Sequence, residues 1–303
     1  MKQIRITFLL TLPVSMVGAK ALAYDAKVDG IYYNFSRRNA TVTYYGITHS
    51  SNLNAYYGSV VIPETVTYNG ITYSVKSIDQ YAFAHRSGLT SVIIPSSVTS
   101  IGNNAFEGCS TLRSVTIPNS IKSISYATFS GCSRLSGVTI PNSVKSIGGS
   151  AFQNCSGLTS ITIPNSVTTI GNYAFSWCSS LEYVTFGTEM KEIGYRAFYH
   201  CSGLTQIISY ASTPPFCDSV AFDEITTSTC TLRVPSGTLK TYKEKYPWKK
   251  FIIIDDISVK SASVVQPETK SVFDLNGRKQ KNVLRGINII WMSDGTSKKV
   301  IKQ

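Results

Sequence analysis

A unit of 23 residues recurs along the middle of this chain, with no insertion between one copy and the next. The copy at residues 158–180, LTSITIPNSVTTIGNYAFSWCSS, shows the pattern most plainly. One phenylalanine position repeats at this spacing: Phe83, Phe106, Phe129, Phe152, Phe175 and Phe198. A single unit of this size cannot bury its own apolar side chains, so neighbouring units must stack. The fixed period therefore predicts a solenoid in which each unit forms one coil.

Each unit consists of two short extended segments followed by a turn. In the copy at 158–180, apolar residues alternate along the first segment up to Pro164, which is typical of a strand buried on one face. The second segment ends at Gly171, where the backbone needs conformational freedom. The side chains that we expect in the stacked core are Leu158, Ile161, Ile163, Ile170, Phe175 and Cys178. Each unit begins with a leucine followed by alternating apolar residues, in the manner of L-x-x-L-x-L. Such a start, repeated every 23 residues, indicates a β-rich leucine-rich-repeat solenoid.

The net charge of +12 is concentrated at the two ends of the chain. Residues 240–303 carry fourteen Lys and Arg against six Asp and Glu, whereas residues 24–239 carry twelve against eleven. A nucleic-acid reader places its basic stripe on the folded surface. The nearly neutral repeat body therefore argues against nucleic acid as a partner.

Five of the seven cysteines occupy one position of the repeat: Cys109, Cys132, Cys155, Cys178 and Cys201. Stacked strands lie about 4.8 Å apart with their side chains pointing the same way, so these residues do not face each other as a disulfide requires. We therefore expect buried, reduced thiols in this column. Cys217 and Cys230 lie outside the column and could pair. Arg86 replaces the cysteine in the first unit, which we expect of a coil near a solvated end.

Residues 1–23 have the composition of a signal peptide. A charged start precedes the apolar run 8–17, and Ala21-Leu22-Ala23 supplies a small-x-small cleavage site. No stretch of the chain approaches the length of about 20 apolar residues that a transmembrane helix needs. The sequence predicts an exported protein with a mature N-terminus at Tyr24 and no transmembrane segment.

The chain divides into six segments by composition. Runs rich in Tyr, Val and Thr before residue 74 predict a β cap that covers the edge of the first coil. A degenerate unit and the run LKTYKEKYPWKKF predict a second cap, and Asn276-Gly277 predicts a hairpin turn in the tail. The segments are signal peptide 1–23, N-terminal β cap 24–73, six repeats 74–209, degenerate repeat and C-terminal cap 210–256, linker 257–270, and a small β-sandwich-like segment 271–303.

The unit I-P-x-S-V-x-x-I-G-x-x-A-F-x-x-C-S-x-L resembles the leucine-rich repeats of BspA-like surface proteins and the Treponema pallidum type of repeat. The resemblance covers about 74–256, because the CTLRVP run from Cys230 and the run 242–248 look like that family's ending. The runs from Val28 and Val60 resemble its N-terminal cap. This resemblance implies a secreted or surface-attached bacterial protein. Some members of the family bind host matrix proteins or other bacteria.

The tail carries a second resemblance. Val272-FDLNGR, Arg285-GINII and the terminal Lys299-VIK look like the C-terminal sorting domain that the type IX secretion system of Bacteroidetes reads. The stretch from Trp291 to Ser297 departs from that pattern by lengthening the last hairpin. The resemblance implies that 271–303 engages the secretion machinery and that the protein reaches the cell surface or the medium.

The chain lacks the motifs that catalysis needs. It has no His-Glu-x-x-His, no Gly-x-Ser-x-Gly and no phosphate-binding glycine loop. His85 and His200 occupy one repeat position five coils apart, and stacking at about 4.8 Å per coil keeps them from sharing a metal. We expect both to be solvated loop side chains. The sequence predicts no catalytic, metal or cofactor site.

The repeats become richer in large side chains toward the C-terminal end. Outward strand positions are small and polar in the early units, and larger or apolar residues replace them in the last two. Exposed aromatics dominate binding hot spots, whereas Ser and Thr seldom do. The candidate ligand surface consists of Tyr183, Thr185, Gln206, Ile208, Trp177, Tyr195 and Tyr199. Tyr183 is the candidate anchor, and the alternative is that these aromatics dock the last coils against the cap.

These observations favour a monomeric, adhesin-like module for a host matrix or bacterial surface protein or glycan. The alternative is a structural component of the cell surface without a specific ligand. A carbohydrate-active enzyme or its accessory module is disfavoured, because no pair of carboxylates recurs at a useful spacing.

Overall fold

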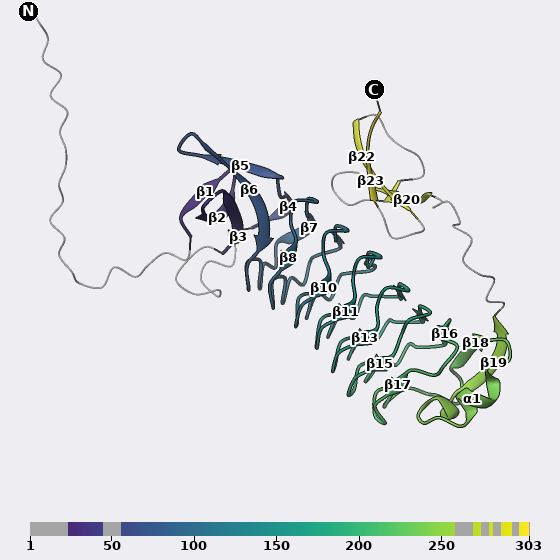
Figure 1. Cartoon of the computed structure of the whole chain (residues 1–303). Helices are drawn as coiled ribbons and strands as arrows, with labels where there is room; N and C mark the ends of the chain where they lie inside the picture. Colours follow the sequence, from purple (N-terminus) through teal and green to yellow (C-terminus); the bar gives the residue numbers. More distant parts are fainter. Residues whose placement is uncertain are drawn as a thin grey trace, which may run out of the picture.

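The computed structural model describes residues 24–44 and 56–257, and the backbone of four strands between 269 and 302. The predicted signal peptide and most of the predicted linker lie outside these residues. The described chain is mostly β-structure, and its coils lie in a row between an N-terminal sheet and a C-terminal cap (Figure 1). This architecture confirms the predicted solenoid. Counted from residue 74, the fifth coil is 166–188 and the sixth is 189–211.

An N-terminal sheet covers the first end of the solenoid. Its strands, in spatial order, are β1 (Ala26–Val28), β2 (Ile31–Ser36), β3 (Asn39–Thr43), β6 (Ile71–Ile78) and β5 (Thr65–Tyr68). Strands β2 and β3 form an antiparallel hairpin, and β6 pairs in parallel with β8 (Ser100–Ile101). The sheet therefore occupies the edge that the first coil would otherwise expose.

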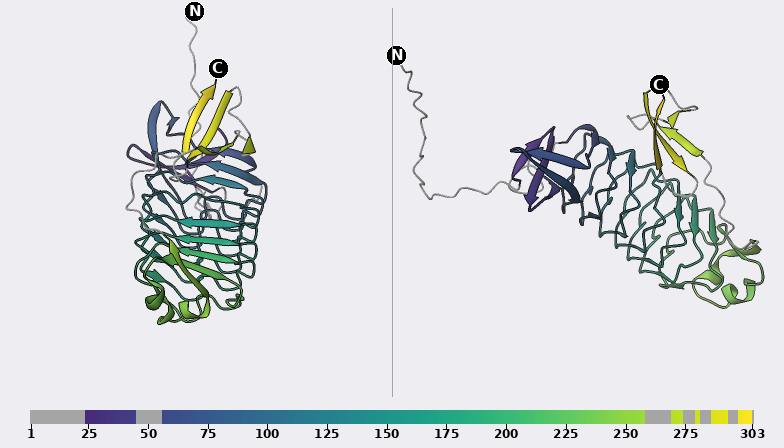
Figure 2. Two further views of the ribbon diagram at one scale, coloured as in Figure 1. Left: turned by 90° about the vertical axis from the view of Figure 1, so that its right-hand side faces the viewer. Right: turned by 45° about the horizontal axis from the view of Figure 1, so that its top comes forward.

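Two sets of parallel strands run along the stack, one for each extended segment of the unit (Figure 2). The first set, here called the first-strand ladder, contains β4 (Gly58–Val61), β7 (Leu89–Ile93), β9 (Ser114–Thr116), β12 (Ser160–Ile163), β14 (Tyr183–Phe186), β16 (Gln206–Ser209), β18 (Thr231–Pro235) and β19 (Ile252–Ile257). The second-strand ladder contains β10 (Ser123–Ile124), β11 (Ser146–Ile147), β13 (Thr169–Ile170), β15 (Glu192–Ile193) and β17 (Phe216–Cys217). Ser160 pairs with Tyr183 and Tyr183 with Gln206, so the repeats place one unit position in one column.

The first-strand ladder is interrupted at the third coil, residues 120–142. No strand forms at 137–139, so β9 and β12 belong to separate sheets. Gly137 replaces the serine of neighbouring coils, and glycine weakens a strand through its backbone entropy and missing side chain. The expectation of two extended segments in every unit is therefore wrong for this coil.

Equivalent side chains stack through the core. Successive phenylalanine rings from Phe83 to Phe198 lie 5.0–5.4 Å apart between centroids. Each column cysteine donates its thiol hydrogen to a phenylalanine carbonyl oxygen, as Cys178 does to Phe152 at 3.2 Å. The side chains of Leu158, Ile161, Ile163, Ile170, Phe175 and Cys178 are all buried. All seven cysteines are free and buried, so Cys217 and Cys230 do not pair.

Arg86 differs from its sequence-based expectation. Its side chain is completely buried, whereas we expected a solvated coil end. The N-terminal segment covers this coil, since the ring of Tyr56 packs on Phe83 with centroids 4.4 Å apart. Burial lowers the pKa of the Arg86 guanidinium, and the neighbouring Tyr56 and Cys109 oppose that shift.

The C-terminal cap closes the other end of the core. Between β18 and β19 the chain forms α1 (Leu239–Lys243) and the 3-10 helix η1 (Trp248–Lys250). The indole Nε1 of Trp248 donates to the Pro215 carbonyl oxygen at 2.9 Å, and the Tyr242 hydroxyl donates to the Ala211 carbonyl oxygen at 2.9 Å. The cap thus buries two large aromatics while satisfying their polar atoms.

The tail forms a separate four-stranded antiparallel sheet. Its spatial order is β21 (Lys279–Gln280), β20 (Thr269–Phe273), β22 (Gly286–Met292) and β23 (Ser297–Lys302). Strands β20 and β21 flank the predicted Asn276-Gly277 turn, which itself lies outside the described residues.

Candidate functional site

The described residues hold no cluster of metal-binding side chains. No group of three His, Cys, Asp or Glu there could hold a metal ion. In the same ranges, each helix is too short and too polar to cross a membrane. The candidate site residues lie instead on two surfaces of the fifth and sixth coils.

Tyr183, Thr185, Gln206 and Ile208 lie together on the outward side of β14 and β16. Tyr183 pairs with Gln206 and Thr185 with Ile208. Tyr183 is half exposed, whereas the other three side chains are partly buried. We call this surface the strand face. Parallel pairing carries it onto β18 and β19, where its members are Thr231, Arg233, Ile252, Ile254 and Asp256.

An ion pair lies at the far end of the strand face. Arg233 donates from Nε and Nη2 to the two carboxylate oxygens of Asp256, at 3.0 and 2.7 Å. This two-point hydrogen bonding lowers the pKa of Asp256 and raises that of Arg233. The pair is exposed to solvent and lies beside the exposed Ile252 and Ile254, so this end of the face offers apolar contact area and a neutralised charge.

Trp177, Tyr195 and Tyr199 gather on the turn that follows the second-strand ladder. The Trp177 ring stacks on His200 at 3.9 Å between centroids and meets Tyr199 edge-on at 5.9 Å. The Arg196 guanidinium lies over the rings of Tyr195 and Tyr199, at 5.3 and 4.6 Å from their centroids. We call this surface the corner cluster. Its members are Tyr173, Trp177, Tyr195, Arg196, Tyr199 and His200.

Four members of the corner cluster have left-handed backbone: Tyr173, Trp177, Arg196 and His200, with φ of 58°, 64°, 50° and 56°. The position of Tyr173 and Arg196 is left-handed in every coil. At the position of Trp177 and His200, the second to fourth coils place Gly108, Gly131 and Asn154, and the first coil places His85 with φ of 57°. Glycine and asparagine adopt this conformation readily, whereas bulky residues crowd their Cβ against the carbonyl oxygen. Large side chains in strained backbone are a recurrent feature of functional sites.

The sequence-based candidates therefore divide between two surfaces. The strand face belongs to the first-strand ladder, whereas the corner cluster belongs to the turns on another side of the coil. In the described part of the chain, no ring contact joins Tyr183 to Trp177, Tyr195 or Tyr199.

Sequence reasoning missed Arg196 and His200. His85 is an exposed turn side chain as expected, but His200 is half-buried against Trp177. The signal was present in the spacing, because His200 follows Trp177 by one repeat length and must lie beside it. Ile252 and Ile254 were missed because β19 lies beyond the regular repeats.

Comparison with known proteins bears on the repeats. Residues 76–205 match the family described as "BspA type Leucine rich repeat region" in six copies. A leucine-rich repeat protein from Bacteroides ovatus is 35% identical, with a TM-score of 0.56, over 70% of this chain and 56% of that protein. The leucine-rich repeat protein of T. pallidum is 27% identical, with a TM-score of 0.55, over 64% of this chain and 86% of that protein.

This chain thus spans little more than half the length of the Bacteroides ovatus protein. A search among curated proteins gave no match. The six-copy match and the two similar structures agree with the stacked coils, the phenylalanine column and the two ladders described above. Residues 76–205 of this chain thus form six repeats that match the BspA-type leucine-rich repeat.

Proposed function

We propose that this chain is a cell-surface binding module that captures a protein or glycan through its fifth and sixth coils. The corner cluster is the principal contact surface, and the strand face around Tyr183 is the second. The observation that carries the proposal is the left-handed backbone of Trp177 and His200. The second to fourth coils carry glycine or asparagine at this position, and the first carries His85 with φ of 57°, so folding does not require the stacked pair of Trp177 and His200.

The alternative role for these aromatics is docking of the last coils against the cap. In the structure, other aromatic residues make that contact. Trp248 of the cap meets Phe186, Phe222 and Tyr242, with ring centroids 6.3, 5.4 and 5.9 Å apart. These four rings are buried. Tyr183 and Trp177 are about half exposed instead, which supports a ligand-contacting role for them.

The charge distribution supports recognition by contact area. The repeat body is nearly neutral, and the guanidinium of Arg196 already lies over two tyrosine rings. Binding that depends mainly on shape and apolar contact changes little with ionic strength. We therefore expect affinity that is only weakly salt-dependent.

Delivery to the surface follows from the two ends of the chain. The signal peptide at 1–23 directs export, and 271–303 serves as a type IX sorting segment. Two experiments test this part of the proposal. N-terminal sequencing of the mature protein should begin at Tyr24, and deletion of 271–303 should retain the protein in the periplasm. Surface display of the truncated protein would contradict the sorting role.

A structural component without a ligand is the competing function. The two functions differ in what substitution of an exposed ring does. Trp177→Asn should abolish capture of the ligand by intact cells while leaving surface abundance unchanged. If cells bearing the variant adhere to matrix proteins, mucins and glycans as wild type does, or if neither adheres, the binding role is wrong.

A further inference from the structure

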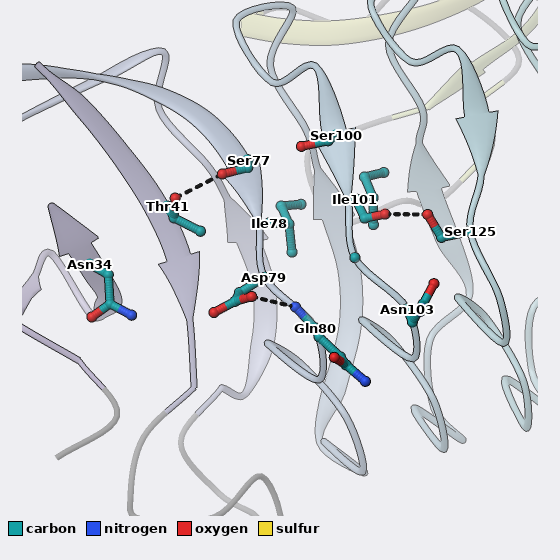
Figure 3. Close-up of a pocket in the computed structure, with 11 residues that line it drawn as sticks. Asn34, Thr41, Ser77, Ile78, Asp79, Gln80, Ser100, Ile101, Asn103 and Ser125 are labelled. Atoms are coloured by element: carbon teal, nitrogen blue, oxygen red, sulfur yellow. Dashed lines mark hydrogen bonds between the residues drawn. The ribbon is translucent and has the colours of Figure 1, made fainter. Parts of the chain in front are cut away.

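A polar hollow lies at the opposite end of the solenoid from the corner cluster. It is open to solvent, has a volume of about 580 Å³, and spans the junction between the N-terminal sheet and the first coils (Figure 3). Volumes of about 300–1,000 Å³ are typical of small-molecule sites. The polar side chains that line it are Asn34, Thr41, Ser77, Asp79, Gln80, Ser100, Asn103 and Ser125.

The fold explains why a carboxylate is present here. Asp79 occupies a repeat position that holds Gly102 in the next coil and Gly171 in the fifth. A Cβ atom on Gly171 would lie 2.6 Å from the Gly149 nitrogen, so close stacking favours glycine in most coils, although Ser125 of the third coil has a side chain at this position. Asp79 instead follows a strand of the N-terminal sheet, and its N–H donates to the Val42 carbonyl oxygen at 2.8 Å. A side chain is therefore tolerated at Asp79.

The hydrogen-bonding groups of the hollow are held in place. Oδ1 of Asp79 accepts from the Gln80 N–H at 2.8 Å, and the Thr41 and Ser77 hydroxyl oxygens lie 2.8 Å apart (Figure 3). Ser125 donates to the Ile101 carbonyl oxygen at 2.6 Å. Among the described residues that line the hollow there is one carboxylate and no Lys or Arg.

This set of groups selects a class of ligand. An anion such as phosphate needs cationic or N–H donors, and the lining residues include no cation. Ile78 and Ile101 are buried, so the hollow offers little apolar surface. Carboxylate and amide oxygens accept hydrogen bonds, amides also donate, and hydroxyls do both. A neutral ligand with several adjacent hydroxyl groups complements this combination.

An exposed tyrosine adjoins the hollow. Gln80, Asn103 and Tyr126 occupy the same position in successive coils. The N–H of Tyr81 donates to the Asn103 carbonyl oxygen at 3.2 Å, and the N–H of Asn104 to the Tyr126 carbonyl oxygen at 2.9 Å, so these turns lie directly side by side. Tyr126 is 55% exposed. Tyr126 follows Ser125, which lines the hollow, and its ring lies beside Gly149 of the fourth coil. The ring can therefore cover the C–H face of a pyranose that extends from the hollow along the coils.

We infer that this hollow is a binding site for a neutral saccharide, with Asp79 and Asn103 binding adjacent hydroxyls and Tyr126 supporting one face of a sugar ring. The site is separate from the proposed ligand surface of the fifth and sixth coils. It gives the chain a second attachment point, at the end of the solenoid nearest the N-terminal cap.

The test is titration of the full chain with lactose, maltose, cellobiose and N,N′-diacetylchitobiose, followed by saturation-transfer and nitrogen-15 NMR. We expect at least one of them to bind and to shift the amide signals of Gln80 and Asn103. Asp79→Ala should weaken that binding by about tenfold or more. Asp218→Ala is the matched control, because Asp218 occupies the same repeat position in the last coil and accepts from the Val220 N–H at 3.0 Å.

Three results would overturn the inference. They are absence of binding by all four disaccharides, equal binding by Asp79→Ala and wild type, and binding that is lost with EDTA, which would indicate a cation site. Trp177→Asn should leave disaccharide binding unchanged. Its effect on macromolecular ligands therefore tests the proposed function independently of this site.

Discussion

The indole of Trp177 lies flat against the imidazole of His200, with ring centroids 3.9 Å apart and an angle of 17° between the ring planes. The two residues occupy one repeat position in successive coils, and both have left-handed backbone. Folding alone is satisfied by glycine or asparagine at this position, as in the second to fourth coils. The stacked pair is therefore the structural feature that most directly suggests a ligand-binding surface.

Trp177→Asn should change the stability of the fold little. Relief of the left-handed backbone stabilises by about 1–2 kcal/mol, and loss of the ring stacking destabilises by about 0.5–1.5 kcal/mol. Urea denaturation should therefore give a free energy of unfolding within about 1 kcal/mol of wild type. Asn154→Gly is the matched control at the same repeat position. A loss of several kcal/mol in Trp177→Asn alone would show that the ring is structural.

Phe152→Ala should destabilise the solenoid strongly. The ring is fully buried and stacks on Phe129 and Phe175, with centroids 5.4 and 5.2 Å away. Truncation of a buried phenylalanine costs about 3–5 kcal/mol, because the rigid columns on either side cannot collapse into the cavity. Calorimetric melting of Phe152→Ala and of the exposed control Tyr126→Ala checks this. An unchanged melting temperature for Phe152→Ala would refute the stacked core.

Gly137→Ser should stabilise the chain by repairing the interrupted ladder. An added Cβ at Gly137 meets no atom within 4 Å, and serine is the residue of neighbouring coils. Replacing glycine where the backbone permits it stabilises by about 0.4–1 kcal/mol. Gly171→Ala is the opposite case, since its Cβ would lie 2.6 Å from backbone, and it should destabilise. The urea midpoint should rise for Gly137→Ser and fall for Gly171→Ala. Midpoints that do not move in these opposite directions would contradict the role of Gly137 in interrupting the first-strand ladder.

The buried thiols predict a loss of stability at alkaline pH. Burial raises the pKa of Cys178 from 9.0 to about 12. The contribution of this thiol to the free energy of unfolding is complete below pH 9. It is lost as the pH rises toward about 12, because the thiol ionises in the unfolded state and not in the folded state over this range. Each such thiol lowers the unfolding free energy by about 1.4 kcal/mol per pH unit in that window. Above pH 9, Cys178→Ala should reduce the slope of the unfolding free energy against pH by that amount. An unchanged slope would contradict the burial of this thiol.

Much of the fold could be predicted from the sequence, because a strict period fixes which side chains meet. The stack of Phe152 between Phe129 and Phe175 follows from spacing alone. The burial of Arg86 does not follow from the spacing, because it depends on Tyr56 and the N-terminal segment, which lie outside the repeat. A periodic pattern identifies contacts between repeats and leaves contacts with the caps undetermined.

The sequence shows which coils carry the large aromatic side chains, and it does not show how those side chains group in space. Aromatic enrichment predicts a binding surface in the fifth and sixth coils. Neighbours in sequence such as Trp177 and Tyr183 nevertheless lie on different sides of one coil, because the chain turns between them. The backbone strain of Trp177 is likewise visible only in the dihedral angles.

The most direct test of the central claim is binding of the full chain, of Trp177→Asn and of Tyr183→Ala to arrays of matrix proteins, mucins and glycans. We predict that wild type binds at least one component with little dependence on salt. Trp177→Asn should abolish this binding, Tyr183→Ala should weaken it, and both variants should melt as wild type does. Absence of binding by wild type, or equal binding by all three proteins, would contradict the assignment of a binding surface to the fifth and sixth coils.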